Sequence, residues 1–167
     1  MNILALDLST KSSGYAIFED ATLKAHGCVT SSSTDLIKRI YIMRNAIDEL
    51  LTNNKIDKIV VEEVRPEGGY GVGNQKTMKA LMYLQAALEF LIHDNHNKVT
   101  IEYVYPSSWR ASCGIKNGRG IKRTSLKEAD IQFVKDTYGV SVGDDEADAI
   151  CIGHAQFNQK SNEINWE

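Results

Sequence analysis

The stretch from Asn2 to Asp20 decides the fold, and it reads Asn-Ile-Leu-Ala-Leu-Asp-Leu-Ser-Thr-Lys-Ser-Ser-Gly-Tyr-Ala-Ile-Phe-Glu-Asp. The apolar run from Ile3 to Leu6 has the length of a buried strand and is too short for a helix. A small, polar turn that ends in Gly14 separates this run from a second one, Tyr15 to Phe18. The stretch therefore predicts a β-hairpin.

The first strand of this hairpin ends in Asp7, a carboxylate that a buried run would normally exclude. Burying an unpaired carboxylate is costly, so its side chain must be protonated, paired or facing a cation. The simpler interpretation is a strand-end aspartate that caps the turn with its own side chain. The hairpin alone leaves both interpretations open.

The composition is that of a globular protein, with 43% hydrophobic and 25% charged residues, and 167 residues suit one domain spanning residues 1–167. No apolar run reaches membrane-spanning length, and the chain begins with a strand and not a signal peptide. The three cysteines are far apart and form no CxxC pair, so reduced thiols in the cytoplasm are expected and a zinc site is not.

The net charge of −3 does not indicate nucleic-acid binding, but the charges are unevenly distributed. Residues 68–88 and 105–127 contain no acid. Such segments predict a polarised surface, and the alternative is a solvated helix face with countercharges from its neighbours. Their basic residues are Lys76, Lys79, Arg110, Lys116, Arg119, Lys122, Arg123 and Lys127.

Hydrophobic periodicity predicts the remaining elements. Strands are expected at 22–29, 59–61 and 100–104, and helices at 36–54, 76–93, 124–138 and 145–158, with a short helix from Pro106. The order β-β-β-α-β-α-β-α-α of the main elements is typical of a layered α/β fold. The glycine-rich residues 65–74 predict a loop, which is not a P-loop because no Gly-Lys-Ser/Thr follows.

Carboxylates also mark two further buried elements. The β-branched run Ile-Val-Val ends in Glu62 and Glu63. Asp145 and Asp148 project from one face of the last helix's first turn, and Asp144 with Asp148 would do nearly as well. Acids in a first turn are also what the helix dipole favours.

Clustered carboxylates repel one another, and they stay ionised together only if divalent cations bind them. Oxygen-only ligands suit Mg²⁺ or Mn²⁺ better than zinc. Two such ions about 4 Å apart stabilise both the attacking and the leaving oxygen of phosphodiester hydrolysis. A polyanionic substrate would also account for the acid-free segments, which would hold its phosphates.

Three motifs lie in register with a known pattern: Asp7-Leu-Ser-Thr-Lys-Ser-Ser-Gly14-Tyr15, Val60-Val61-Glu62-Glu63-Val64, and Asp145-Glu-Ala-Asp148-Ala-Ile-Cys-Ile-Gly-His154. They resemble the RuvC-type Holliday-junction resolvases of the RNase H-like/retroviral-integrase superfamily, over nearly the whole chain. Actin-like kinases share a hairpin like the first motif, whereas the three together are specific. The resemblance implies an RNase H-like α/β fold, a five-stranded mixed sheet flanked by helices, and the spacing is most similar to phage-encoded members.

The resemblance also selects Glu62 over Glu63 and Asp145 over Asp144. The residues implied in catalysis and in binding two Mg²⁺ ions, or Mn²⁺ in their place, are Asp7, Glu62, Asp145 and Asp148. Lys122 or a neighbouring base is expected to stabilise the developing charge. The expected DNA-binding residues are Lys11, Arg65, Tyr70, Lys76, Arg110, Lys116, Arg119, Lys122, Arg123 and Lys127. Ser9 stands where the family often has Gly, and Arg65 lies where it has an aromatic, so the residue that probes the junction centre is left open.

The implied function is that of a homodimer that makes paired symmetric nicks in four-way DNA junctions, in a bacterial or infected-host cytosol. The 76–93 helix is the expected interface, because its apolar positions cover more than one face. The alternatives are a broader branched-DNA or RNA nuclease, like the YqgF-like proteins, and a non-catalytic junction-binding module. A sugar-kinase-like phosphotransferase is excluded, because 167 residues leave no room for its second, ATP-binding domain.

Overall fold

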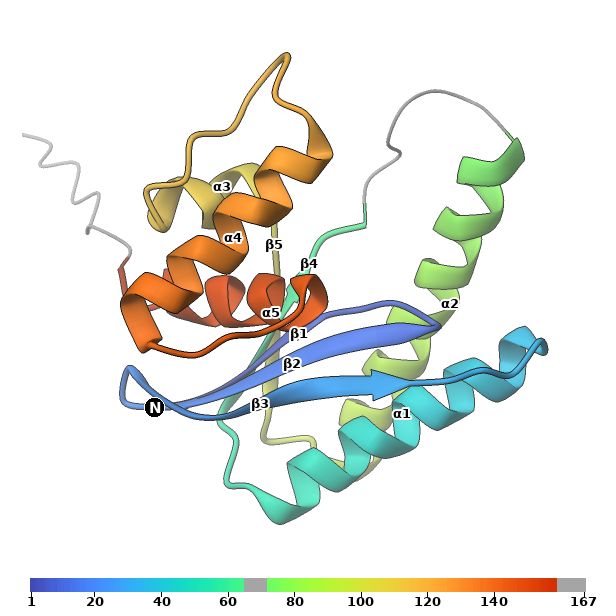
Figure 1. Ribbon diagram of the computed structural model, residues 1–167. Helices are drawn as coiled ribbons and strands as arrows, with labels where there is room; N and C mark the ends of the chain where they lie inside the picture. The colour runs from blue at the N-terminus through green and yellow to red at the C-terminus, as the bar shows by residue number, and fades with distance from the viewer. Residues whose placement is uncertain (65–71, 159–167) are drawn as a thin grey trace, which may run out of the picture.

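The computed structural model describes residues 1–64 and 72–158, and its centre is a mixed β-sheet (Figure 1). Within the described residues this sheet has five strands in the order β3-β2-β1-β4-β5. β1 pairs antiparallel with β2 and parallel with β4, β2 pairs antiparallel with β3, and β4 pairs parallel with β5. The strands are β1 (Asn2–Asp7), β2 (Ser12–Glu19), β3 (Thr22–Thr30), β4 (Lys58–Glu62) and β5 (Thr100–Val104).

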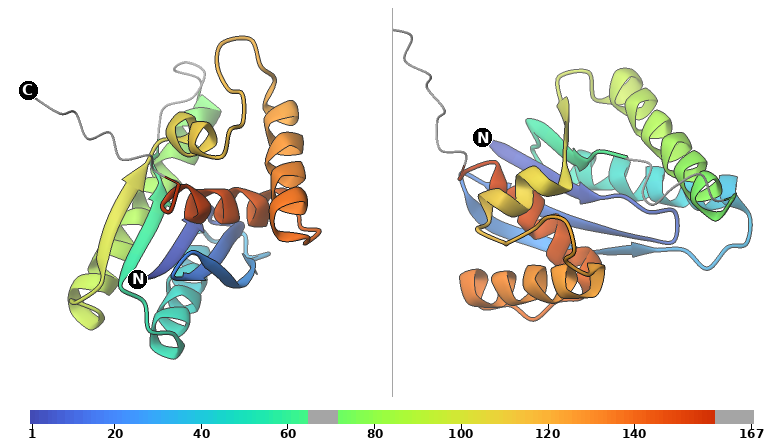
Figure 2. Two further views of the ribbon diagram at one scale, coloured as in Figure 1. Left: turned by 90° about the vertical axis from the view of Figure 1, so that its left-hand side faces the viewer. Right: turned by 90° about the horizontal axis from the view of Figure 1, so that it is seen from above.

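Helices cover both faces of the sheet, because alternate residues of β1 face opposite ways. Leu4 and Leu6 belong to a core with α1 (Leu36–Asn53) and α2 (Val72–Asn95). Ile3 and Ala5 belong to a second core with three other helices. Figure 2 shows these three helices on the face of the sheet opposite to α1 and α2. These helices are α3 (Pro106–Ser112), α4 (Arg123–Tyr138) and α5 (Asp144–Ala155).

Two glycines let α5 lie directly on the hairpin. A Cβ on Gly14 of β2 would stand 1.9 Å from the backbone oxygen of Asp145, and one on Gly153 of α5 would stand 2.3 Å from the Phe18 ring. Gly14 is also the partner of Asp7 in the β1–β2 ladder. The backbone contact therefore brings the N-terminus of α5 to the strand end that carries Asp7.

The predicted elements are confirmed, with differences at helix ends. The last helix starts at Asp144 after the N-cap Gly143 and ends at Ala155, earlier than predicted. Asp144 is therefore the first helical residue and not the N-cap, and its side chain accepts a hydrogen bond from Lys127. α2 starts before residue 76, and α4 starts one residue before 124. The loop predicted at 65–74 falls largely outside the described residues. Among the described helices, none is long and apolar enough to cross a bilayer.

Candidate active site

The ends of β1 and β4 bring Asp7 and Glu62 together. Leu6 pairs with Val61 in the parallel β1–β4 ladder. Asp7 directly follows Leu6, and Glu62 directly follows Val61. Neighbouring parallel strands end at the same edge of a sheet, so both side chains are presented there. The N-terminus of α5 adds Asp145 and Asp148 to this edge through the Gly14 contact.

The carboxylates of Glu62, Asp145 and Asp148 each lie within electrostatic reach of Asp7. Burial, the charge of Glu62 and the charge of Asp145 raise the pKa of Asp7 to about 8. Burial, the charge of Asp7 and the neighbouring Asp130 raise the pKa of Asp148 to about 9. Carboxyl groups with such pKa values retain protons near pH 7 until a cation or another positive charge replaces them.

These shifts predict how the metal-free protein responds to pH. The folded state holds protons on Asp7 and Asp148 that the unfolded chain releases above pH 4, so stability falls as pH rises to about 9. We expect the melting temperature in chelator to fall by about 5 °C or more between pH 5 and pH 9. An Asp7→Asn/Asp148→Asn variant should show a flatter profile by circular dichroism, and parallel profiles would contradict the two raised pKa values.

The carboxylates do not form a closed metal-binding set in this arrangement. Among the described residues, no three His, Cys, Asp or Glu side chains converge tightly enough to hold a metal ion. Protein donors occupy some of their oxygens: Ser12 Oγ donates to Asp145 Oδ2 at 2.6 Å, and Trp109 Nε1 to Glu62 Oε2 at 2.9 Å. Asp148 Oδ1 is buried with no hydrogen-bond partner in the described part of the chain. A buried oxygen without a donor and a set of oxygen ligands suit Mg²⁺ or Mn²⁺.

Lys127 of α4 is a base that contacts these carboxylates. Its Nζ lies 2.6 Å from Asp144 Oδ2 and 3.7 Å from Asp148 Oδ2. Burial alone would lower the pKa of Lys127, but Asp144 and Asp148 together raise it. Lys122, to which the sequence assigned a catalytic role, is exposed at the N-cap of α4. Lys127 is therefore the neighbouring base that the structure brings to the site.

Two residues that sequence reasoning missed, Trp109 and Asp130, are buried beside the site. Arg110, expected to bind DNA, turns inward and donates through Nε and Nη2 to Asp130. Its side chain is only 12% exposed and its guanidinium pairs with a buried carboxylate, so the expected phosphate contact of Arg110 is not supported. A tryptophan three residues after a helix-starting proline is a sequence signal for the first residue, whereas nothing in the sequence marks Asp130 as buried.

Most other expected DNA-binding residues lie on the surface. Exposed side chains occur at Lys11 in the β1–β2 turn, Lys76 in α2, Lys116 and Arg119 between α3 and α4, and Lys122 and Arg123 at the start of α4. Arg123 and Lys127 also act on the site, because both lower the pKa of Asp7 against the larger effects that raise it. Arg65 and Tyr70 lie outside the described residues.

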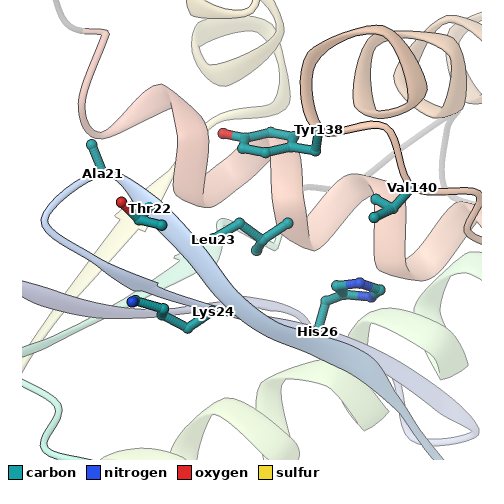
Figure 3. Close-up of a pocket in the computed structure, with 7 residues that line it drawn as sticks. All are labelled: Ala21, Thr22, Leu23, Lys24, His26, Tyr138 and Val140. Atoms are coloured by element: carbon teal, nitrogen blue, oxygen red, sulfur yellow. The ribbon is translucent and has the colours of Figure 1, made fainter.

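A pocket of about 410 Å³ lies away from the carboxylates, between β3 and the C-terminal end of α4 (Figure 3). None of the four acids lines it. His26, one of its lining residues, bonds Glu146 at 2.9 Å. Because its lining residues come from β3 and the end of α4 and include none of the proposed ligands, this hollow does not bear on the candidate site.

Several solved structures resemble the chain over nearly its whole length. Thermus thermophilus RuvC in complex with a Holliday junction substrate has a TM-score of 0.72 at 13% identity, covering 95% of this chain and 93% of that chain. Fowlpox virus resolvase in complex with Holliday junction DNA has a TM-score of 0.56 at 17% identity, covering 94% of this chain and 97% of that chain. The yeast mitochondrial Holliday junction resolvase Ydc2 has a TM-score of 0.58 at 16% identity, covering 93% of this chain and 77% of that chain. The chain has the fold of the RuvC-like resolvases.

At such low identity these likenesses establish the fold alone. The RuvC-like, RNase H-like architecture predicted from the three motifs, with a five-stranded mixed sheet flanked by helices, is confirmed. No protein-family model and no curated protein sequence matches the chain. The phage origin stays a prediction.

Proposed function

We propose that the protein is a divalent-cation-dependent endonuclease that resolves four-way DNA junctions by paired symmetric nicks. The observation that supports this most strongly is the meeting of carboxylates from β1, β4 and α5 at one edge of the sheet. The fold is that of resolvases, two of which are known in complex with Holliday junction DNA.

The metal ligands in this proposal are Asp7, Glu62, Asp145 and Asp148, holding two Mg²⁺ ions or Mn²⁺ in their place. The bound cations supply positive charge that stabilises the attacking and leaving oxygens of the phosphodiester. Asp7 and Asp148, whose pKa values are raised, release protons when cations bind. The Lys127 ammonium lies 3.7 Å from Asp148 Oδ2, and its positive charge helps to stabilise negative charge that develops on the phosphate.

The exposed bases around the α3–α4 connection are proposed to hold DNA phosphates. Replacing Lys116, Arg119 or Lys122 with Ala should weaken binding to all junction sequences about equally, and each should reduce the salt slope of binding by roughly one. Fluorescence anisotropy at several salt concentrations measures both quantities. A changed sequence preference with an unchanged slope would contradict phosphate contact.

A homodimer would present one active site to each of two opposed strands. The proposed interface is α2, which buries Leu84, Leu88 and Leu91 in the core and leaves Met82 and Phe90 exposed at 52% and 69%. An apolar row left in solvent on a helix that already has a buried face is typical of an interaction surface.

Met82→Glu should therefore yield a folded monomer that keeps its metal affinity and loses paired incision first. Tyr41→Glu on α1, where the side chain is also exposed, is the control and should stay dimeric. Light scattering at micromolar concentration measures the assembly state. A wild type that is monomeric there and still cuts in pairs would rule out the dimer.

A supercoiled plasmid that extrudes a cruciform tests the function itself. Paired incision gives linear plasmid and a single nick gives open circles, so the product reports coordination directly. We expect Mg²⁺-dependent linear product from this plasmid and none from a plasmid without the inverted repeat. Equal cutting of both plasmids would indicate a broader nuclease, and binding without cutting would indicate a binding module.

A further inference from the structure

Trp109 of α3 reaches from the core to a proposed metal ligand. Its side chain is 1% exposed and packs in the cluster that contains Val60 and Ile150. The indole nitrogen donates to Glu62 Oε2 at 2.9 Å. An indole is a donor only, and a buried one needs an acceptor. Here the acceptor is the carboxylate at the end of β4, so the hydrogen bond fixes how that carboxylate is turned.

The next residue of α3, Arg110, lies near a proposed ligand on the other side of the site. Its guanidinium lies over the Trp109 ring at 4.1 Å. It donates to both oxygens of Asp130, a fully buried residue of α4, at distances of 2.8 to 3.2 Å. Its Nη2 also lies 3.9 Å from Asp148 Oδ1, the buried oxygen without a hydrogen-bond partner among the described residues.

This geometry links carboxylates that come from different elements. Glu62 belongs to β4 and Asp148 to α5, and two consecutive residues of one short helix touch the first and approach the second. A planar, stacked guanidinium held by a bidentate carboxylate has little freedom to move. Figure 1 shows α3, α4 and α5 grouped on the same side of the sheet.

We infer that Trp109 and Arg110 are positioning residues that orient Glu62 and Asp148 for binding divalent cations. The inference rests on the proposed function, because it assigns a task to groups that touch the ligands and not the DNA. Partners of this kind orient metal ligands, and their loss typically weakens metal affinity by about tenfold or more.

If Trp109 has only a structural role in the core, a different result is expected. The Trp109→Phe variant distinguishes this structural role from the positioning role. Phenylalanine keeps an aromatic body under Arg110 but lacks the N–H donor. If the residue only fills space, the melting temperature falls and Mn²⁺ affinity does not change. If it positions Glu62, the dissociation constant for Mn²⁺ rises about tenfold. The kcat for junction cleavage should then fall while KM stays near the wild-type value.

Calorimetric titration with Mn²⁺ gives the decisive comparison among wild type, Trp109→Phe, Glu62→Gln and the double variant. We expect the phenylalanine substitution to add little once Glu62 is already replaced, because it acts through that carboxylate. Ser107→Ala, an exposed change on the same helix, is the control and should match the wild type. Arg110→Lys, which keeps the charge but not the bidentate geometry, should also weaken Mn²⁺ binding.

An unchanged Mn²⁺ affinity in Trp109→Phe, or an equal loss with and without Glu62, overturns the inference but leaves the proposed function intact. A wild type that binds no Mn²⁺, or binds it equally after Glu62→Gln, overturns both. If Trp109→Phe does not fold, an NMR experiment on the wild type tests the inference instead. The Trp109 indole N–H resonance, assigned with Trp166→Phe, should shift on adding Mg²⁺, and no shift contradicts the inference.

Discussion

Replacing Asp7 with Asn should abolish junction cleavage while leaving junction binding intact or tighter. The change removes a proposed cation ligand, and it also removes a negative charge from beside a polyanion. We expect a loss of about a thousandfold or more in rate, the upper range for a single electrostatic stabiliser. Since burial already raises the pKa of Asp7 to about 8, asparagine resembles its protonated form and should not destabilise the fold.

The two neighbouring glutamates provide the matched comparison for this variant. Glu62→Gln should behave like Asp7→Asn, whereas Glu63→Gln should be much milder. Glu63 follows β4, its backbone N–H donates to Val104 O at 2.8 Å, and successive strand side chains point to opposite faces. Gel shifts and single-turnover cleavage measure the two properties. Full cleavage by Asp7→Asn in Mg²⁺ would sink the assignment, and a greater sensitivity at Glu63 would show that the wrong glutamate was chosen.

Gly14→Ala should be strongly destabilising. The added Cβ would stand 1.9 Å from Asp145 O and 2.4 Å from its carbonyl carbon, and both are backbone atoms that cannot rotate away. β2 and α5 must therefore separate, at a cost of about 3 kcal/mol, the upper part of the range for overpacking. The separation also moves Asp145 away from Asp7, so cleavage should fall with stability.

Gly143→Ala is the control, because this glycine caps the same helix. Its φ of −76° is open to any residue, and a Cβ added there would meet no described atom within 4 Å. Losing a glycine N-cap should cost about 1 kcal/mol or less. Urea unfolding measures both changes, and equal stability of the two alanine variants would mean that α5 does not rest on Gly14.

The sequence predicted the sheet and its acidic edge because both depend on local pattern. The hairpin follows from two apolar runs around a turn that ends in Gly14, and Asp7 and Glu62 meet because each directly follows a strand. Hydrophobic periodicity also predicted the helix at 36–54, in which Ile40, Met43 and Ile47 lie in the core.

The interior around the acids could not be predicted in the same way. Arg110 appeared to be a surface base because its segment has no acid, yet its partner Asp130 lies 20 residues further along the chain. Such a pair is visible only once α3 packs against α4. The choice between Lys122 and Lys127 depended likewise on how α4 lies against α5, which the spacing of basic residues does not specify.

Cleavage of a synthetic four-way junction, beside a linear duplex of the same sequence, tests the central claim most directly. In Mg²⁺ the wild type should nick two opposed strands at symmetric positions and leave the duplex uncut, and chelator should stop the reaction. Cleavage that persists in chelator, or that proceeds equally on the linear duplex, would contradict a cation-dependent junction resolvase built on these carboxylates.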